Sequence, residues 1–148
     1  MNEKVVATNR KARFEYFILE TYEAGISLSG SEIKSVRAGQ ISLSEAYVRV
    51  EDGKNAWLIG AHISPYDPAS RYNHNPTRPR RLLLNKKEIR DIWNDVRLKG
   101  VTVVPIRVYL THGLAKIEIG IAKGKKLYDK RNEIAKRDSE RDQERRER

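Results

Sequence analysis

The sequence predicts a mainly β fold with short α-helices: a small antiparallel barrel, closed or partly closed, with a charged tail. Apolar and polar residues alternate in segments 46–63 and 101–122, and each segment is divided by a turn, as in a β-hairpin. Ser29 and Asn85 each stand three residues before a glutamate, and this capping-box spacing predicts two helices. Residues 129–148 contain only two aliphatic side chains, too few to offset the entropy of ordering by packing.

The first part of the chain predicts strands followed by a short helix. Residues 14–28 mix aromatic and aliphatic residues with Thr and Glu, which indicates one or two strands around residues 24–25. The first capped helix carries Ile33 and Val36 at helical spacing. Gly39 ends this helix after about two turns.

The middle of the chain predicts a hairpin and a long loop. The hairpin turns at residues 51–55, and its apolar residues at period two are Ala46, Val48, Val50, Trp57, Ile59, Ala61 and Ile63. Residues 64–80 hold four of the five prolines, and a connection of this length is typical of a functional or mobile loop. Residues 81–84 predict a short strand that ends the loop.

The last part of the body predicts a helix and a second hairpin. The capped helix at residues 85–99 ends at Gly100, and its apolar stripe is Ile89, Ile92, Trp93 and Val96. The hairpin turns at residues 112–113, with Lys116 on the face opposite the apolar residues. Pro105 must lie at an edge or a bulge because it cannot donate to a ladder. Since a helix interrupts the strand series before this hairpin, we expect an OB-like barrel with two or three flanking helices.

The positive charge belongs to the body of the chain. The 148 residues carry a net charge of +10, and residues 128–148 hold eight Lys or Arg against seven Asp or Glu. Residues 1–127 therefore keep a net charge of +9. We divide the chain into a domain at 1–127 and a charged tail at 128–148. A basic body favours a polyanionic partner, with a membrane surface as the rival interpretation.

Several classes of function are disfavoured by what the sequence lacks. It has no cysteine, no apolar run of membrane-spanning length and a polar start at residues 1–4, which together fit a cytoplasmic protein. His62, His74 and His112 stand apart from one another, without metal-ligand spacing. No nucleotide-binding loop or nucleophile elbow is present. We expect no metal, no cofactor and no catalytic residue.

Basic residues gather in three places, which together favour phosphate contacts over a merely solvated face. The first is residues 9–13 and the third is Lys123, Lys125 and Lys126. The second lies in the proline-rich loop and comprises Arg71, Arg78, Arg80 and Arg81, interleaved with Tyr66, Tyr72 and His74. These aromatic rings could stack on unpaired RNA bases or could equally pin the loop to the barrel.

The tail carries charges at helical spacing. Its favourable pairs are Glu133 with Arg137, Glu144 with Arg148, and Asp138 with Arg141. Each pair contributes only a few tenths of a kcal/mol, so the alternatives are a solubilising end and an arm that folds on a partner. We predict that the tail is disordered when free and helical when bound to RNA.

Taken together, these motifs resemble the SmpB family, the SsrA-binding proteins that partner tmRNA in bacterial ribosome rescue. The matching stretches, in family order, are residues 9–13, 16–18, 22–25, 31–39, 62–66, 75–84 and 124–131. The resemblance covers nearly the whole chain and is weakest at residues 138–148, where only the charged character agrees.

The resemblance implies an RNA-binding adaptor rather than an enzyme. Family members bind the tRNA-like domain of tmRNA through an OB-like barrel and deliver it to stalled ribosomes for trans-translation. Their tail enters the decoding centre and the vacant mRNA channel of the 30S subunit within the 70S ribosome. Elongation factor Tu, with alanyl-tmRNA, is implied as an indirect partner. The chain is expected to be a monomer without membrane contact.

The resemblance also implies site residues. Asn9, Glu23 and Lys116 are expected on the RNA-facing surface, where Glu23 would accept from a base edge or ribose hydroxyl, or orient a neighbouring arginine. The whole expected RNA-binding set is Asn9, Arg10, Lys11, Arg13, Glu23, Arg37, Lys116, Lys123, Lys125 and Lys126. The ribosome-contacting tail residues are Tyr128, Asp129, Lys130 and Arg131. Two alternatives stay open: a ribosomal or ribosome-assembly protein with the same barrel, and a nucleic-acid-processing enzyme.

Overall fold

The computed structural model describes residues 3–66 and 73–125. The expected site residues Lys126 and 128–131 lie outside this part of the chain, as do Arg71, Tyr72 and the whole of the tail. The division of the chain at residue 127 therefore stays a prediction.

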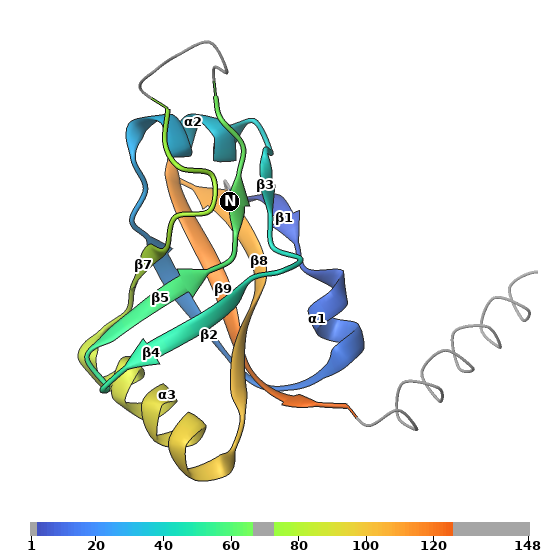
Figure 1. The fold of residues 1–148 in the computed structure, drawn as a ribbon, viewed down its shortest axis with the longest axis vertical. Coiled ribbons are helices and arrows are strands. Elements are labelled where there is room, and N and C mark those ends of the chain that lie inside the picture. Colours follow the sequence, from blue (N-terminus) through green and yellow to red (C-terminus); the bar gives the residue numbers. More distant parts are fainter. Residues whose placement is uncertain (1–2, 67–72, 126–148) are drawn as a thin grey trace, which may run out of the picture.

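The largest structural element of the described chain is one antiparallel sheet, as the sequence predicts (Figure 1). Its strands, with the small β3–β6 pair, are β1 (Lys4–Thr8), β2 (Tyr16–Ile26), β3 (Ile41–Ser42), β4 (Tyr47–Glu51), β5 (Asn55–Ile59), β6 (His62–Ile63), β7 (Arg80–Leu83), β8 (Thr102–Thr111) and β9 (Leu114–Gly124). The order across the main sheet is β1-β8-β9-β2-β7-β5-β4. Strand β4, at one end of this order, returns to lie against β8, so the sheet encloses the core as a partly closed barrel.

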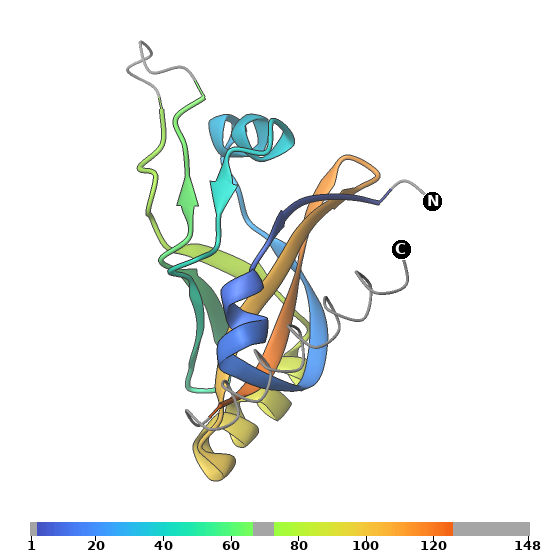
Figure 2. The same ribbon diagram turned by 90° about the vertical axis from the view of Figure 1, so that its right-hand side faces the viewer.

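Three helices flank the sheet: α1 (Arg10–Glu15), α2 (Gly30–Arg37) and α3 (Lys86–Lys99). Helices α2 and α3 lie at opposite ends of the sheet, and α1 lies beside it (Figure 1, Figure 2). The two predicted capping boxes are confirmed, since Ser29 and Asn85 each accept from the backbone of the glutamate three residues on. Gly100 ends α3 in the left-handed conformation, as predicted.

The N-terminal part differs from the prediction. The basic run at residues 10–15 is helix α1, and strand β1 precedes it at the edge of the sheet. One continuous strand, β2, follows directly from residue 16. Helix α1 has no apolar stripe, because most of its residues are charged and Ala12 is its only buried residue. Hydrophobic periodicity therefore does not predict it.

The first hairpin forms as predicted, but one of its faces was assigned wrongly. Ala56 and Leu58 are buried in β5, whereas Trp57 and Ile59 are only half-buried. Gly60 then adopts a φ of +81°, and a Cβ there would lie 2.5 Å from the carbonyl oxygen of Glu45. This break shifts the alternation by one residue, so that Ala61 and Ile63 point into the core.

The second hairpin matches its prediction. On the inner face of β9 the buried residues are Ala115, Ile117, Ile119 and Ile121, and Lys116 lies on the opposite face. Pro105 sits at a register shift between β8 and β9, so the bulge it requires is confirmed. Residue 9 follows β1 at this bulge, and its backbone N–H donates to the carbonyl oxygen of Ile106 at 2.7 Å.

The core lies between the inner face of the sheet and the two flanking helices α2 and α3. Val36 of α2 and Ile92 of α3 are both fully buried in it. Trp93 was predicted to be buried with the rest of the apolar stripe, but it is only half-buried. No helix within residues 3–66 and 73–125 is long and apolar enough to cross a bilayer.

Candidate nucleic-acid interface

Asn9 is buried rather than on the surface, which corrects the expectation for its side chain. It caps α1: the Oδ1 atom accepts from the backbone N–H of Ala12 at 3.2 Å. Its Nδ2 atom donates to the carbonyl oxygen of Pro105 at 2.9 Å. With 5% of its surface exposed and both ends of the amide in use, Asn9 fixes the start of α1 on the β8 bulge.

The cations of α1 lie at the surface. Arg10 and Arg13 are exposed, and neither guanidinium has a partner within residues 3–66 and 73–125. Lys11 is also exposed and lies 3.6 Å from the carboxylate of Glu45, a pair weakened by solvent. The helix is held by Ala12, which packs on the second face of the sheet against Val104 and Ala122. The arginines therefore project from a fixed backbone.

The C-terminal end of β9 brings two further predicted cations beside α1. Lys123 is exposed, and Lys125 donates to the backbone carbonyl of Arg13 at 3.2 Å. The Lys125 ammonium also lies 5.2 Å from the centre of the Phe17 ring, which is 45% exposed. We call the surface formed by Arg10, Lys11, Arg13, Lys123 and Lys125 the α1 basic surface.

A cavity of about 310 Å³ opens next to the α1 basic surface. Arg13, Phe17 and Lys125 line one part of it, and Glu118 lines another. Ile106 also lines the cavity, and a Cβ at the neighbouring Gly120 would lie 2.8 Å from its side chain. Cations can bind phosphate and an exposed aromatic ring can stack on a base, so this cavity has groups for both. Glu118, however, places a negative charge on one of its walls.

The other predicted residues gather at the opposite end of β9, beside α2. Arg37 of α2 is exposed and donates to the carbonyl oxygen of Gly113 in the β8–β9 turn at 3.3 Å. Lys116 is half-buried, lies opposite Gly25 of β2, and has no partner within the described part of the chain. Lys116 and Lys123 are seven residues apart along the strand, or about 23 Å. The predicted cations therefore form two groups.

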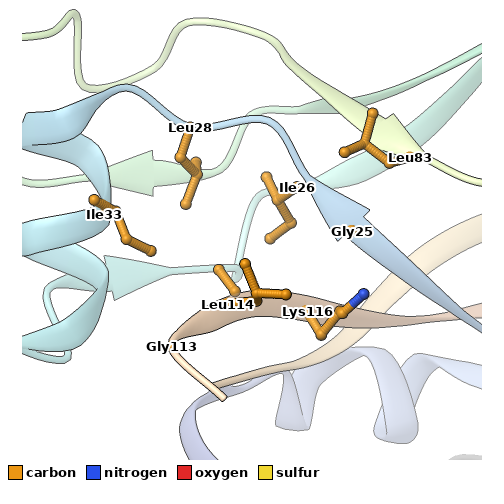
Figure 3. Close-up of a pocket in the computed structure, with 9 residues that line it drawn as sticks. Gly25, Ile26, Leu28, Ile33, Leu83, Gly113, Leu114 and Lys116 are labelled. Carbon is orange, nitrogen blue, oxygen red and sulfur yellow. The ribbon is translucent and has the colours of Figure 1, made fainter. Parts of the chain in front are cut away.

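An apolar cavity of about 300 Å³ lies between α2 and this end of the sheet (Figure 3). Ile26, Ile33 and Leu114 extend toward a common space, with Lys116 at its margin (Figure 3). Leu114 is 60% exposed and Leu83, also in the lining, is 56% exposed. We call this surface, with Arg37, Glu23 and Lys116, the α2-end surface.

Glu23 lies on the outer face of β2, exposed, as expected from the sequence. Its carboxylate accepts a hydrogen bond from the hydroxyl of Tyr109 on β8. Burial, and then the hydrogen bond to Glu23, raise the pKa of the Tyr109 hydroxyl well above its ordinary value. The phenol therefore stays protonated near neutral pH and acts as a donor.

The proline-rich loop does not present the free basic cluster that the sequence suggested. Arg80 is completely buried and pairs with the equally buried Glu32 of α2 at 2.7 Å. Arg78 donates to the same carboxylate through its Nε atom at 3.0 and 3.1 Å. Burial would raise the pKa of Glu32, but the hydrogen bonds from Arg78, the Ser29 backbone and Arg80 outweigh it and lower the pKa to about 2. These two arginines hold the loop to α2.

The aromatic residues of this loop divide between the two interpretations. His74 contacts the Ser31 hydroxyl at 2.9 Å and the carbonyl oxygen of Ile63 at 2.8 Å, so it pins the loop. Tyr66 is 55% exposed, with the Lys34 ammonium 5.5 Å from its ring centre. Tyr66 thus remains available for stacking.

Sequence reasoning missed two residues of this region, Glu32 and Tyr109. Glu32 was assigned only as a helix cap, and nothing local marks its pairing with an arginine 48 residues away. Tyr109 stands in an apolar run, where a tyrosine signals only a need for a hydroxyl partner. Within the residues described, no group of three or more His, Cys, Asp or Glu side chains could hold a metal ion.

Comparisons with known proteins agree with the resemblance in the motifs. The family model of the SmpB protein matches residues 6–148. The SsrA-binding protein of Roseiflexus sp. (strain RS-1) is 60% identical over 144 residues, 97% of this chain and 90% of that protein. That of Desulforudis audaxviator (strain MP104C) is 54% identical over 140 residues, covering 95% of this chain and 91% of the relative.

A solved structure shares the fold as well. It is described as "tmRNA-SmpB: a journey to the center of the bacterial ribosome", and its matching chain is 46% identical to this one. The two superpose with a TM-score of 0.68, over 82% of this chain and 85% of the other. The sequence match to the family model extends beyond the barrel, to residue 148. The chain therefore belongs to the SmpB family.

Proposed function

We propose that this chain is an RNA-binding adaptor that binds the tRNA-like domain of tmRNA and delivers it to stalled ribosomes for trans-translation. The observation that carries the proposal is the 46% identity, over most of both chains, to a protein solved with tmRNA on the bacterial ribosome. The SsrA-binding proteins that match over more than 90% of this chain support the same RNA partner.

In this proposal the two basic groups have different partners. The α2-end surface, with Glu23, Arg37 and Lys116, contacts tmRNA, because it combines cations for phosphate with an acceptor for a base edge or ribose hydroxyl. The α1 basic surface adjoins residue 125, after which the tail follows. We assign it to RNA contact near the ribosomal end of the protein, together with Lys126.

The tail completes the proposed mechanism. Residues 128–131 contact the decoding centre, and the rest of the tail becomes helical in the vacant mRNA channel. A channel that still holds mRNA excludes the tail by steric overlap, so tail folding tests for vacancy. Backbone chemical shifts of the free protein that showed a stable helix beyond residue 131 would contradict this mechanism.

The remaining parts of the proposal concern cellular context. We infer a cytoplasmic monomer without enzymatic activity, for which elongation factor Tu with alanyl-tmRNA is an indirect partner. The alternative of a ribosome-assembly protein with the same barrel predicts binding to ribosomal RNA in place of tmRNA. An assay for RNA hydrolysis and nucleotide turnover tests the remaining enzymatic alternative.

The test of the proposed function is a binding comparison. The full-length chain is titrated into a transcript of the tmRNA tRNA-like domain and into an unrelated folded RNA of equal length, at the same salt concentration. We expect a clear preference for the tRNA-like RNA, because shape and unpaired bases add to the shared phosphate attraction. Equal affinity for the two RNAs would overturn the proposal.

A further inference from the structure

Glu23 and Tyr109 meet on the outer face of the sheet, across the strand between them. Strand β9 separates β2 from β8, and Glu23 lies opposite Glu118 in the register. Glu118 in turn lies opposite Arg107, and Lys116 lies opposite Tyr109. Since these positions alternate with the buried residues of β9, all five side chains share the outer face.

Tyr109 is held rigidly in this group. Only 3% of its surface is exposed, and the Arg107 guanidinium lies 4.6 Å from the centre of its ring. Arg107 itself bonds to Glu3 at 2.5 Å and to Glu118 at 3.4 Å. The ring therefore has one orientation, and its hydroxyl points at the Glu23 carboxylate.

Electrostatic repulsion disfavours the position of the Glu23 carboxylate unless a partner holds it there. It faces Glu118 directly on the neighbouring strand, and like charges in that arrangement repel. Its side chain is exposed, so without a partner it could rotate away into water. The Tyr109 hydroxyl engages the Oε2 atom, while the Oε1 atom has no partner within residues 3–66 and 73–125.

We propose that Tyr109 is a positioning residue for RNA recognition: its hydroxyl fixes the Glu23 carboxylate so that the second oxygen faces the RNA as an acceptor. The inference rests on the proposed function and adds to it. A carboxylate repels phosphate, so the donor on the RNA is a base N–H or a ribose hydroxyl. Glu23 thus discriminates among RNA groups, while Lys116, opposite Tyr109 on β9, supplies charge.

The test uses Tyr109→Phe in the full-length chain, with the transcript of the tmRNA tRNA-like domain as the probe. The substitution keeps the ring and its contact with Arg107, and removes only the hydroxyl. We expect about tenfold weaker binding, the size of one hydrogen bond to a charged group. The dependence of affinity on salt should stay the same, because no phosphate contact is lost. Tyr47→Phe, an exposed tyrosine on β4, is the matched control and should bind like the wild type.

The same substitution in a Glu23→Ala chain distinguishes a positioning role of Tyr109 from a direct contact with RNA and from a purely structural role. In a Glu23→Ala chain, Tyr109→Phe should weaken binding no further, since Tyr109 acts through Glu23. Unchanged affinity of Tyr109→Phe, or an equal loss in both backgrounds, overturns the inference. Failure of the wild-type chain to prefer the tRNA-like RNA instead overturns the proposed function.

A further variant keeps the inference testable if Tyr109→Phe fails to fold. Glu23→Gln can still accept from Tyr109 through its amide oxygen, but it then presents an NH2 group to the RNA. We expect its binding to fall as far as that of Glu23→Ala. Wild-type affinity for Glu23→Gln would overturn the inference.

Discussion

Arg80 and Glu32 form an ion pair from which water is completely excluded. Arg80 donates to the Oε2 atom of Glu32 at 2.7 Å, and both side chains are 0% exposed. The other guanidinium nitrogens donate to the carbonyl oxygens of Ala61 at 2.8 Å and Pro76 at 3.0 Å. This arrangement joins the start of α2, the end of the first hairpin and the proline-rich loop. It thereby fixes the helix that carries Arg37.

Breaking this pair from one side should destabilise the fold strongly. Glu32→Gln leaves the Arg80 charge buried without a counter-charge, and we expect a loss of about 3–5 kcal/mol in the free energy of unfolding. Urea unfolding followed by tryptophan fluorescence measures it. The control is Glu51→Gln, which removes an exposed pair with Arg49 and should cost under about 1 kcal/mol. A similar small loss for Glu32→Gln would contradict the role assigned to the pair.

The Glu32 carboxylate should also make the free energy of unfolding depend on pH in the acid range. The pKa of Glu32 in the fold is about 2, below its ordinary value of 4.5. Its contribution is therefore fully present above pH 4.5 and is lost as the pH falls from 4.5 through about 2, because the unfolded chain binds the proton more tightly. The shift corresponds to about 3 kcal/mol at most.

Unfolding free energies measured between pH 6 and pH 2 test this dependence. The wild type should lose stability across the acid range, and Glu32→Gln should show a shallower decline at the same salt concentration. Identical slopes for the two chains would mean that other carboxylates cause the acid sensitivity.

The sequence predicted those features whose cause is local. A capping box, a glycine helix end and a proline at a bulge each depend on residues a few positions apart, and all three were confirmed at Ser29, Gly100 and Pro105. The phase of β5 was missed because it depends on Gly60, whose conformation follows from a close approach to Glu45. Local patterns cannot reveal such distant contacts.

The candidate site was predicted less completely, for the same reason. Charge alone marks Arg13, Lys116 and Lys123 as surface cations, and each is indeed unpaired within residues 3–66 and 73–125. Charge alone also marks Arg80, which is instead buried beside Glu32. Whether a basic residue faces solvent or a buried carboxylate is decided by tertiary packing.

Trp93 of α3 should contribute less to stability than a fully buried tryptophan would. Trp93 is half-buried, with Arg97 5.9 Å from its ring centre, whereas Ile92 is fully buried. We expect Ile92→Ala to cost about 2–5 kcal/mol and Trp93→Ala to fall below the 3–5 kcal/mol typical of a buried aromatic. Both should leave the RNA affinity of the folded protein unchanged, since α3 lies at the end opposite α2 (Figure 1). A folded Trp93→Ala chain that no longer binds RNA would mean that α3 belongs to the interface.

The response to salt should identify which cations contact phosphate. If Lys116 contacts one phosphate, Lys116→Ala should reduce the slope of log affinity against log salt by about 0.9, by analogy with duplex DNA. Filter binding at several salt concentrations measures the slope. Lys54→Ala is the control, because Lys54 is an exposed cation in the turn between β4 and β5, away from the α2-end surface. The same slope for both variants would exclude Lys116 as a phosphate contact.

Removing the tail should separate RNA binding from ribosome rescue. A chain that ends at residue 126 keeps both basic surfaces and nearly all of the net positive charge, because residues 128–148 contribute only +1. Its affinity for the tmRNA tRNA-like domain should therefore stay close to that of the full chain. Tagging of peptides on stalled ribosomes should be abolished, since the tail carries the proposed contact with the decoding centre. A full-length chain with residues 128–131 changed to alanine is the control for length, and it should also bind tmRNA and fail to tag. Equal loss of RNA binding and tagging in the truncated chain would show that body and tail act as one unit.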